Sequence, residues 1–534
     1  MEGFSRAYRI GYFLGRGRKE RECPMARDRA SLVLALILVL VPGGLLLSSH
    51  LGAPFDKNHI GFTAAWYSLS ARNFLSYGPA RLDGCLSIES GPRAARPRLY
   101  RDHPPGVGLV LAGVFALFGE GELQARATAL ALSLLAAVFF LLYARRLFGG
   151  ELRPAVFGVL LSLATPVWAF YGSLVDPHGP GLLLSLAGSS WAASRWEGEG
   201  RRRDLSWACL FVALGCLYDW AAVLIAGPLG LWALLSPRKG AWKGAFALWG
   251  TWAFCFGLLF LQVSLAAGGG GGGLLLPLIK RSAFFGGDLH LHGRTYSFWE
   301  VLLQVAKWNW KGIPLPLTLS GLAGALLALG DARRREIPWA GALLVLPYFM
   351  GTVISLVFLE AAFEHDYLQI YFAPGAGLGT AYLVYRILRR RPSLAFLLQA
   401  GSVLLLVTCL LWGGWKSRAR WEAQEAGLGL YREAGRTLAE KVEPGEYLLA
   451  ETSFLPPLAY YSRRRIFWNV AGPSSLPDPR DTQGMIPGGI LVRPGARRGF
   501  LLEWARRRFK ALKGPFPLAG GDLELYTLED GRER

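Results

Sequence analysis

Long apolar stretches alternate with short polar connectors along most of this chain. A membrane-crossing helix needs about 20 apolar residues to cross about 30 Å of hydrocarbon. About eleven stretches meet or approach that length, so the pattern predicts an all-α polytopic membrane protein. The predicted spans are residues 31–49, 124–144, 154–173, 179–194, 205–218, 220–235, 244–266, 314–330, 338–359, 367–385 and 393–413.

Two long polar segments, residues 50–123 and 267–313, interrupt this alternation. Within the first, residues 56–77 have apolar side chains at near-helical spacing, which predicts an amphipathic helix on the membrane surface. Residues 105–118 are apolar but too short to span comfortably, so we expect a juxtamembrane or re-entrant helix. The second segment begins with six glycines, residues 268–273, which we expect to form a flexible hinge. It ends in a tryptophan-rich stretch that suits a helix at the interface.

After the last predicted span, polar and apolar residues mix, as in a water-exposed domain. The periodicities alternate between those of helices and strands, which predicts a small α/β domain. The expected helices are residues 421–442 and 500–512, and the expected strands are residues 447–451, 489–492 and 523–528.

Composition agrees with a membrane protein, because 52% of the residues are hydrophobic, only 18% are charged, and the mean hydropathy is +0.30. The net charge of +20 would suit a nucleic-acid-binding protein, but Lys and Arg gather in every second connector. The connectors between them contain neither residue, which is the positive-inside pattern, and no nucleic-acid partner is predicted. The basic connectors hold Arg145, Arg146 and Arg153; Arg195 and Arg201 to Arg203; Arg238, Lys239 and Lys243; Arg333 to Arg335; and Arg386 and Arg389 to Arg391.

This charge pattern predicts the topology. The basic tail of residues 1–30 contains eight Lys and Arg residues and is placed in the cytoplasm. The membrane module of residues 31–414 then presents the loops 50–123 and 267–313 on the outer face. The C-terminal domain of residues 415–534 also lies outside. We expect the plasma (inner) membrane as the location, with membrane lipids as partners.

Ionisable residues avoid the middle of the predicted spans and gather at their outer ends. Ion-coupled transporters usually place such charges near the bilayer midplane, so this distribution indicates a site at the outer interface. The residues are Asp56, Asp102, His103, Arg126, Asp176, His178, Asp219, Glu364, His365 and Asp366.

Asp56 and Asp176 are the candidate catalytic residues. A carboxylate just outside the membrane can accept a proton from a hydroxyl or amine nucleophile and orient it. The alternative is an ordinary solvated aspartate that caps the first turn of a helix. No residues are assigned to a metal, although a divalent metal stays open as a cofactor.

A set of basic residues on the outer face could bind an anionic headgroup such as a phosphate. The alternative for any single member is general attraction to anionic lipid. Because the set lies opposite the positive-inside bias, we interpret it as a binding site. Its members are Arg101, His103, Arg126, Lys280, Arg281, Arg294 and His365.

Several short motifs occur in a characteristic order. The chain resembles the GT-C superfamily of integral-membrane glycosyltransferases, in the branch related to protein O-mannosyltransferases and lipid A aminoarabinose transferases. It departs from that branch in having Lys57 after Asp56, where relatives often have Asp-Glu, and His103 where some have lysine before Pro-Pro. The motifs are Phe55-Asp56, Ala71 to Leu75, Tyr77-Gly78, Tyr100-x-x-His103-Pro104-Pro105, Leu117 to Gly119, Arg126, Arg145 to Gly149, Pro166, Tyr171-Gly172-x-x-x-Asp176, Asp219-Trp220, His365-x-Tyr367 with Pro374, and Pro456 to Arg463.

The resemblance implies a GT-C fold and an inverting sugar transfer from a polyprenyl-phosphate donor on the outer face. The acceptor would be a protein, a lipid or a cell-envelope glycan. Asp56 would be the general base, Asp176 would position the acceptor or a metal, and the basic set with Tyr367 would bind the donor. The alternatives are a lipid or saccharide transporter without covalent chemistry and a non-catalytic assembly partner.

Overall fold

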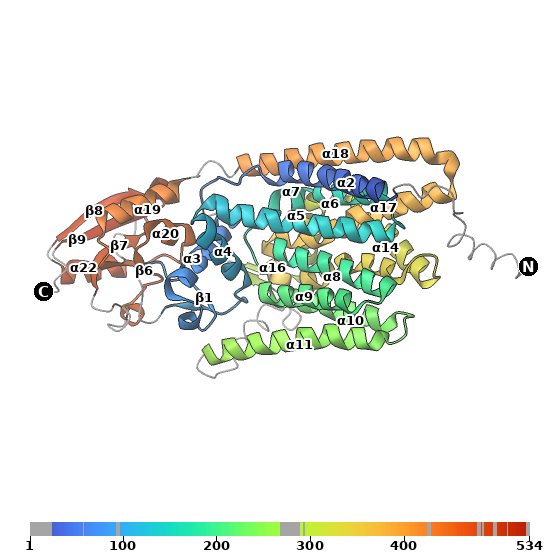
Figure 1. Cartoon of the computed structure of the whole chain (residues 1–534). Coiled ribbons are helices and arrows are strands. Elements are labelled where there is room, and N and C mark those ends of the chain that lie inside the picture. Colours follow the sequence, from blue (N-terminus) through green and yellow to red (C-terminus); the bar gives the residue numbers. More distant parts are fainter. Residues whose placement is uncertain are drawn as a thin grey trace, which may run out of the picture.

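The computed structural model describes residues 24–56, 58–91, 97–266, 289–291, 294–423, 429–477, 482, 485–494, 499–509 and 511–529. A bundle of long helices fills one end of the molecule, and a β-sheet with its helices lies at the other end (Figure 1). Lys280, Arg281 and the glycines 268–273 lie outside the described residues.

The helices of the bundle follow the apolar stretches, because each of the predicted spans coincides largely with helix. One of them is divided into the separate helices α6 and α7, and two others begin with the 3-10 turns η4 and η5, which lead into α15 and α17. The elements are α2 (Pro24–Leu47), α5 (Glu122–Leu147), α6 (Leu152–Leu163), α7 (Pro166–Tyr171), α8 (Pro180–Glu199), α9 (Arg202–Tyr218), η2 (Trp220–Ala222), α10 (Val223–Leu235), α11 (Ala241–Ala266), α14 (Leu315–Arg333), η4 (Trp339–Val345), α15 (Leu346–Val357), η5 (Asp366–Tyr371), α17 (Phe372–Arg390) and α18 (Ala395–Glu422).

Six helical segments among the described residues are long and apolar enough to cross a membrane by length and composition. The remaining spans of the expected eleven, and therefore the full number of crossings, stay predictions. The six segments are Arg29–Leu47, Glu122–Leu147, Ala241–Ala266, Leu315–Arg333, Trp339–Val357 and Pro392–Glu422.

The first polar segment folds into two helices, α3 (His59–Tyr77) and α4 (Gly106–Phe118), and a short antiparallel pair of strands. Contrary to the expected helix on a membrane surface, α3 is covered by protein on most sides: 13 of its 19 residues are buried. Its polar side chains are satisfied internally, since Ser70 and Asn73 both donate to the carbonyl of Ser87 over 3.0 Å. The strands β1 (Leu86–Ser87) and β2 (Leu99–Tyr100) pair with each other, and this pairing positions the short segment that runs from β2 to His103.

The second polar segment contributes β3 (Leu289–Leu291), β4 (Arg294–Tyr296) and α13 (Phe298–Gly312). The short helix α16 (Leu359–Glu364) lies beside α13. The helix α13 is the expected tryptophan-rich helix. It begins with a capping box, in which the Ser297 hydroxyl accepts the N–H of Glu300 and the Glu300 carboxylate accepts the N–H of Ser297.

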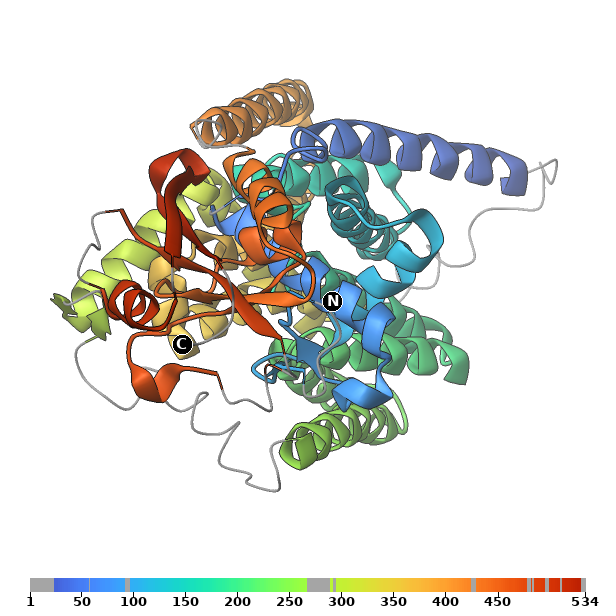
Figure 2. The ribbon, with the colours of Figure 1, turned by 90° about the vertical axis from the view of Figure 1, so that its left-hand side faces the viewer.

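The C-terminal part of the chain contains a five-stranded mixed sheet of order β6-β5-β7-β9-β8. The strand β5 runs parallel to β6 and β7, and β9 runs antiparallel to β7 and β8, with Leu449 opposite both Phe467 and Ile490. Figure 2 shows the strands in front of the helical bundle. The elements are α19 (Leu430–Lys441), β5 (Glu446–Ala450), α20 (Pro456–Ser462), β6 (Arg465–Phe467), β7 (Ile486–Val492), α22 (Phe500–Arg508), β8 (Ala511–Leu518) and β9 (Leu523–Glu529).

Side chains alternate between the two faces of this sheet, as strand geometry requires. Leu448 packs with α19 and α20 on one face, whereas Leu449 packs with α22 on the other. The strands β6 and β8 were not expected, and the expected helix 421–442 is divided between the end of α18 and α19. The boundary at residue 415 and the extracytoplasmic placement stay predictions.

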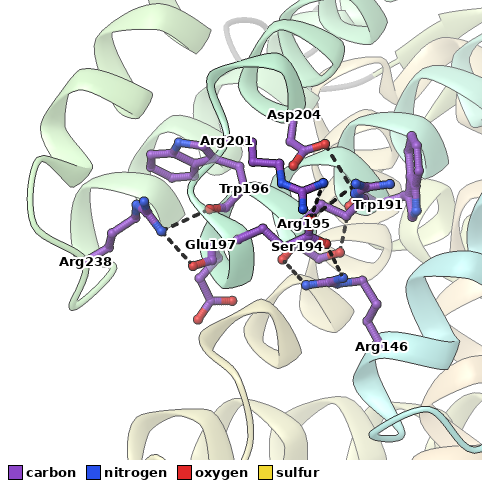
Figure 3. A network of polar contacts seen from close by, with 10 residues as sticks. Arg146, Trp191, Ser194, Arg195, Trp196, Glu197, Arg201, Asp204 and Arg238 are labelled. Carbon is purple, nitrogen blue, oxygen red and sulfur yellow. Dashed lines mark hydrogen bonds and ion pairs between the residues drawn. The ribbon is translucent and has the colours of Figure 1, made fainter.

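The end of the bundle remote from the sheet is held by arginines of the basic connectors (Figure 3). Arg146 of α5 donates to the Ser194 carbonyl of α8 over 3.3 Å, and Arg195 lies 3.2 Å from the buried carboxylate of Asp204. Arg238 donates to two carbonyls of the last turns of α8. These arginines therefore join α5, α8 and α9 and the connector after α10, besides carrying the charge that favours a cytoplasmic location.

Small residues allow α14 and α17 to approach closely. A Cβ atom on Gly324 would collide with the carbonyl oxygen of Gly379, and one on Gly379 would collide with that of Gly321. The Ser320 and Thr380 hydroxyls lie 2.7 Å apart across the same contact. Such contacts are a common basis of helix association in membranes.

We expect Gly324→Ala to lower the midpoint of thermal unfolding in detergent, because the added methyl forces α14 and α17 apart at a cost of about 1–3 kcal/mol. Gly257→Ala in α11 is the matched control, since nothing lies within 4 Å of its added Cβ and alanine favours helix over glycine. Equal midpoints for the two variants would contradict this account of the contact.

His50, in the connector after α2, joins three distant segments. Its ring stacks on Trp421 of α18 with centroids 4.7 Å apart, and its Nε2 lies 2.8 Å from the Ser173 hydroxyl. The ring is 3% exposed. Burial, with a smaller contribution from Arg126, lowers the pKa of His50 from 6.5 to about 3.

The lowered pKa predicts a loss of stability in acid. The unfolded chain binds a proton at His50 as the pH falls below about 6.5, whereas the folded chain does so only near pH 3. The free energy of unfolding should therefore fall by about 2 kcal/mol by about pH 5 through this residue alone. In His50→Asn, the difference between thermal midpoints at about pH 8 and about pH 5 should be smaller than in the unchanged protein. An undiminished difference would show that His50 does not contribute.

Candidate active site

Four segments that are far apart in the sequence enclose a cavity of about 290 Å³. The helix α3 forms one wall, and the others come from the segment after β2, the connector between α7 and α8, and the segment that joins α16 to η5. The polar residues of its lining are His59, Thr63, Tyr67, Tyr100, His103, Asp176, His178, Glu364, His365 and Tyr367. The cavity therefore contains four of the predicted site residues: His103, Asp176, His365 and Tyr367.

Asp219 lies at the centre of a cluster with two of these histidines. One of its oxygens, Oδ2, is 3.2 Å from Nδ1 of His103 and 3.2 Å from Nδ1 of His178. Its other oxygen accepts the N–H of Ala221 over 2.7 Å, which fixes the carboxylate at the start of η2. The cluster could hold a metal ion, because its three donor atoms lie within 4.8 Å of one another.

The two buried carboxyls of this region differ in their pKa. Burial raises the pKa of Asp176 to about 6, against the lowering effect of His178. For Asp219 burial acts in the same direction, but His178, His103 and the N–H of Ala221 outweigh it and lower its pKa. One site thus holds an ionised carboxylate and a second carboxyl that exchanges protons near neutral pH, which is typical of sites that transfer protons.

His59 is a cavity residue that the sequence interpretation missed. It stacks on Tyr367 with ring centroids 4.6 Å apart, and the ring of His365 lies 4.7 Å away. Burial, followed by the charge of His365, lowers the pKa of His59 to about 3, so its ring is neutral at neutral pH. Its Nε2 is buried without a hydrogen-bond partner, which leaves it available to a substrate hydroxyl. Its position on the helix face shared with Phe62 and Thr63 was the available signal.

Asp56 is 4% exposed and lies three residues before His59. Its backbone packs directly against Gly61 in the first turn of α3, where a Cβ atom would collide with the nitrogen and oxygen of Asp56. Asn58 caps the same turn by accepting the N–H of Gly61 over 2.7 Å. The catalytic assignment of Asp56 stays a prediction, but its backbone position is closely defined.

The residues just before Asp56 are held from two sides. Arg126 of α5, which is fully buried, donates to the carbonyls of Ala53 and Pro54 and lies over the ring of Phe55. From the C-terminal domain, the hydroxyl of Tyr461 in α20 accepts the N–H of Phe55 over 2.8 Å. Arg126 therefore binds backbone carbonyls in this structure, whereas the sequence predicted that it would bind a phosphate.

Two further residues of the predicted basic set, Arg101 and Arg294, are described by the structure and do not line the cavity. The guanidinium of Arg101 donates to the carbonyl of Ala266 at the end of α11, and Arg294 is exposed on β4. Their assignment to donor binding is not supported by proximity to the cavity.

A second hollow of about 1100 Å³ runs along α7, α13, α14 and α18. Asp366 lines this groove, and the next residue, Tyr367, lines the cavity. Arg420 of α18 donates to Asp366 over 2.5 Å, and the Tyr171 hydroxyl donates to the same carboxylate over 2.6 Å. The groove is mostly apolar, and its basic residues are Lys307, Lys311, Lys416 and Arg420.

Residues 102–263 match a protein-family model described as dolichyl-phosphate-mannose-protein mannosyltransferase. This part of the chain contains His103, Asp176, His178 and Asp219. A search of curated proteins finds no match.

Solved structures resemble nearly the whole chain. ArnT from Cupriavidus metallidurans in the apo state has a TM-score of 0.61 and 14% identity, over 95% of this chain and 100% of that one. The same protein bound to undecaprenyl phosphate has a TM-score of 0.60 and 14% identity, over 95% and 99%.

The archaeal oligosaccharyltransferase AglB from Archaeoglobus fulgidus, in complex with an inhibitory peptide and a dolichol-phosphate, has a TM-score of 0.55 and 12% identity, over 93% and 74%. With the six candidate spans, these likenesses indicate a multi-pass membrane protein. The family match and the shared architecture confirm the resemblance that the order of motifs predicts: the chain has the fold of the GT-C superfamily of integral-membrane glycosyltransferases.

Proposed function

We propose that this protein transfers a sugar from a polyprenyl-phosphate donor to an acceptor nucleophile on the outer face of the plasma membrane. The observation that carries the proposal is the cavity in which histidines and carboxyls of four distant segments meet beside a long apolar groove. Such a pair of hollows suits a substrate with a polar sugar-phosphate and an apolar chain. The binding of undecaprenyl phosphate and dolichol-phosphate by ArnT and AglB supports this class of donor.

In this reaction, the acceptor oxygen or nitrogen attacks the anomeric carbon from the face opposite the phosphate. The bond between that carbon and the phosphate oxygen breaks, and its electron pair stays on the released lipid phosphate. Asp56 accepts the proton of the nucleophile. One displacement inverts the anomeric configuration, so the account requires an inverting transferase.

Asp176 is assigned to hold the acceptor. Its Oδ1 accepts the N–H of His178 over 2.9 Å, and this fixes the carboxyl toward the cavity that it lines. His59 and Tyr367 form a stacked wall against which a sugar ring can lie. Lys307, Lys311 and Lys416 supply positive charge along the groove for the anionic donor.

The proposed topology determines on which side of the membrane the acceptor binds. The C-terminal domain contacts α3 through Leu69 and lies next to the Asp56 segment through α20. We place this domain outside the membrane, where it can receive a protein, lipid or cell-envelope glycan as acceptor.

We expect Asp56→Asn to fold normally and to lose transfer from a polyprenyl-phosphate sugar by about 10²- to 10⁴-fold, because the amide cannot accept the proton. The measurement is transfer of radiolabelled sugar from the lipid donor by purified protein, with thermal unfolding as the check on folding.

Asp83→Asn is the matched control. Asp83 is exposed in a left-handed turn that asparagine also tolerates, so the same chemical change should leave transfer intact. Asp56→Asn with undiminished transfer would refute the role of Asp56. Donor lipid moved across sealed vesicles without a covalent product would instead support a transporter.

We also expect Gly61→Ala to reduce transfer while preserving the fold, because the added methyl displaces the backbone of Asp56. A shift of about 1 Å in a reacting group costs about 10²-fold in rate. Gly52→Ala, in the same connector and with nothing within 4 Å of its added Cβ, should transfer normally. If both variants are equally active, the position of the Asp56 backbone does not limit the reaction.

A further inference from the structure

The cluster of Asp219 with His103 and His178 has the features of a metal site. Its residues come from three separated segments: the segment after β2, the connector between α7 and α8, and the connector between α9 and η2. The three side chains are mostly buried, with exposed fractions of 14%, 18% and 2% for His103, His178 and Asp219. The two imidazole rings lie almost perpendicular, with centroids 5.2 Å apart, so both nitrogens can face one point.

The distances fit the edges of a metal tetrahedron. Zinc lies about 2.0–2.1 Å from histidine nitrogens and about 2.0–2.2 Å from carboxylate oxygens, and tetrahedral angles then separate two ligands by about 3.3–3.5 Å. Each histidine Nδ1 is 3.2 Å from Oδ2 of Asp219. Two of the three ligand pairs are therefore at about the tetrahedral spacing, and all three donor atoms lie within 4.8 Å of one another.

The contact of His178 with Asp219 differs from that of His103. The His178 Nδ1 lies 3.2 Å from Oδ2 of Asp219 but is buried without a hydrogen-bond partner, whereas His103 makes the hydrogen bond to the same oxygen. A buried imidazole nitrogen without a hydrogen-bond partner is destabilising, and a metal bond would offset that cost.

The surroundings also hold the ligands in place. The N–H of Ala221 fixes the second oxygen of Asp219, and the Tyr371 hydroxyl donates to the carbonyl of His178. Outer contacts of this kind orient the ligands of metal sites.

We propose that His103, His178 and Asp219 bind one divalent cation of the zinc class at the wall of the cavity. Two histidines and one carboxylate leave an open position, as catalytic zinc sites do. Binding of the ion stands on geometry alone, whereas its role rests on the proposed function.

That role is to hold the donor phosphate. The described lining of the cavity contains no lysine or arginine, but it contains Asp176 and Glu364. A divalent ion with one carboxylate ligand brings a net positive charge to this wall. A phosphate oxygen at the open position would be stabilised as the bond to the sugar breaks and the electron pair moves to that oxygen.

The test uses the full chain in detergent, purified with a tag that contains no histidine, stripped with a chelator and reloaded with Zn²⁺ or Co²⁺. Elemental analysis should find about one ion per chain, and Co²⁺ should give the visible absorption of a four-coordinate site. His178→Gln and His103→Gln should weaken binding by at least about tenfold. His365→Gln, which changes a cavity histidine outside the cluster, should retain the ion.

The outcomes separate the two proposals. The metal site is overturned if the unchanged protein binds no ion. It is also overturned if both cluster variants unfold normally and bind as much ion as the unchanged protein. Sugar transfer by the metal-free protein at the full rate overturns the role of the ion and leaves the glycosyltransferase function standing. An ion bound at the cluster with no transfer from any polyprenyl-phosphate sugar supports the site and counts against the proposed function.

Discussion

The architecture around the cavity depends on one buried arginine. Arg126 lies near the N-terminus of α5 and donates to the carbonyls of Ala53 and Pro54, so a long helix of the bundle fixes the chain directly before Asp56. Burial of a guanidinium is costly, and here two backbone carbonyls accept its hydrogen bonds and the ring of Phe55 lies against it. The close approach of Asp56 to Gly61 then transmits that position to α3.

The C-terminal domain completes the same arrangement from the opposite side. Tyr461 accepts the N–H of Phe55 and donates to Glu122 over 2.7 Å, and Glu122 also pairs with Arg432 of α19 at 2.5 Å. These contacts connect the domain, the first connector and the start of α5. The domain therefore packs directly against the segment that carries Asp56. This explains why a sheet-containing domain far along the sequence lies next to the first polar segment.

Much of the bundle could be predicted because apolar length and charge alternation act locally along the chain. The convergence of His103 and Asp176 could also be expected, since both follow from a shared outer face. Three features could not be inferred. The charge of Arg126 predicted that it binds a phosphate, and only the tertiary contacts show that it donates to backbone carbonyls instead. His59 belonged to an expected surface helix. Asp219 was one of many ionisable residues expected at the outer face, and only the structure shows two histidines beside one of its oxygens.

The proposed reaction of the cavity is an inverting sugar transfer. The most direct measurement incubates the purified protein with a polyprenyl-phosphate sugar of defined anomeric configuration and with cell-envelope extract as the acceptor. Nuclear magnetic resonance and mass spectrometry then identify the products. The account predicts a new glycosidic bond of inverted configuration and an equal molar amount of released polyprenyl phosphate. A product that retains the donor configuration, or an intact donor with a range of sugars and acceptors, would contradict it.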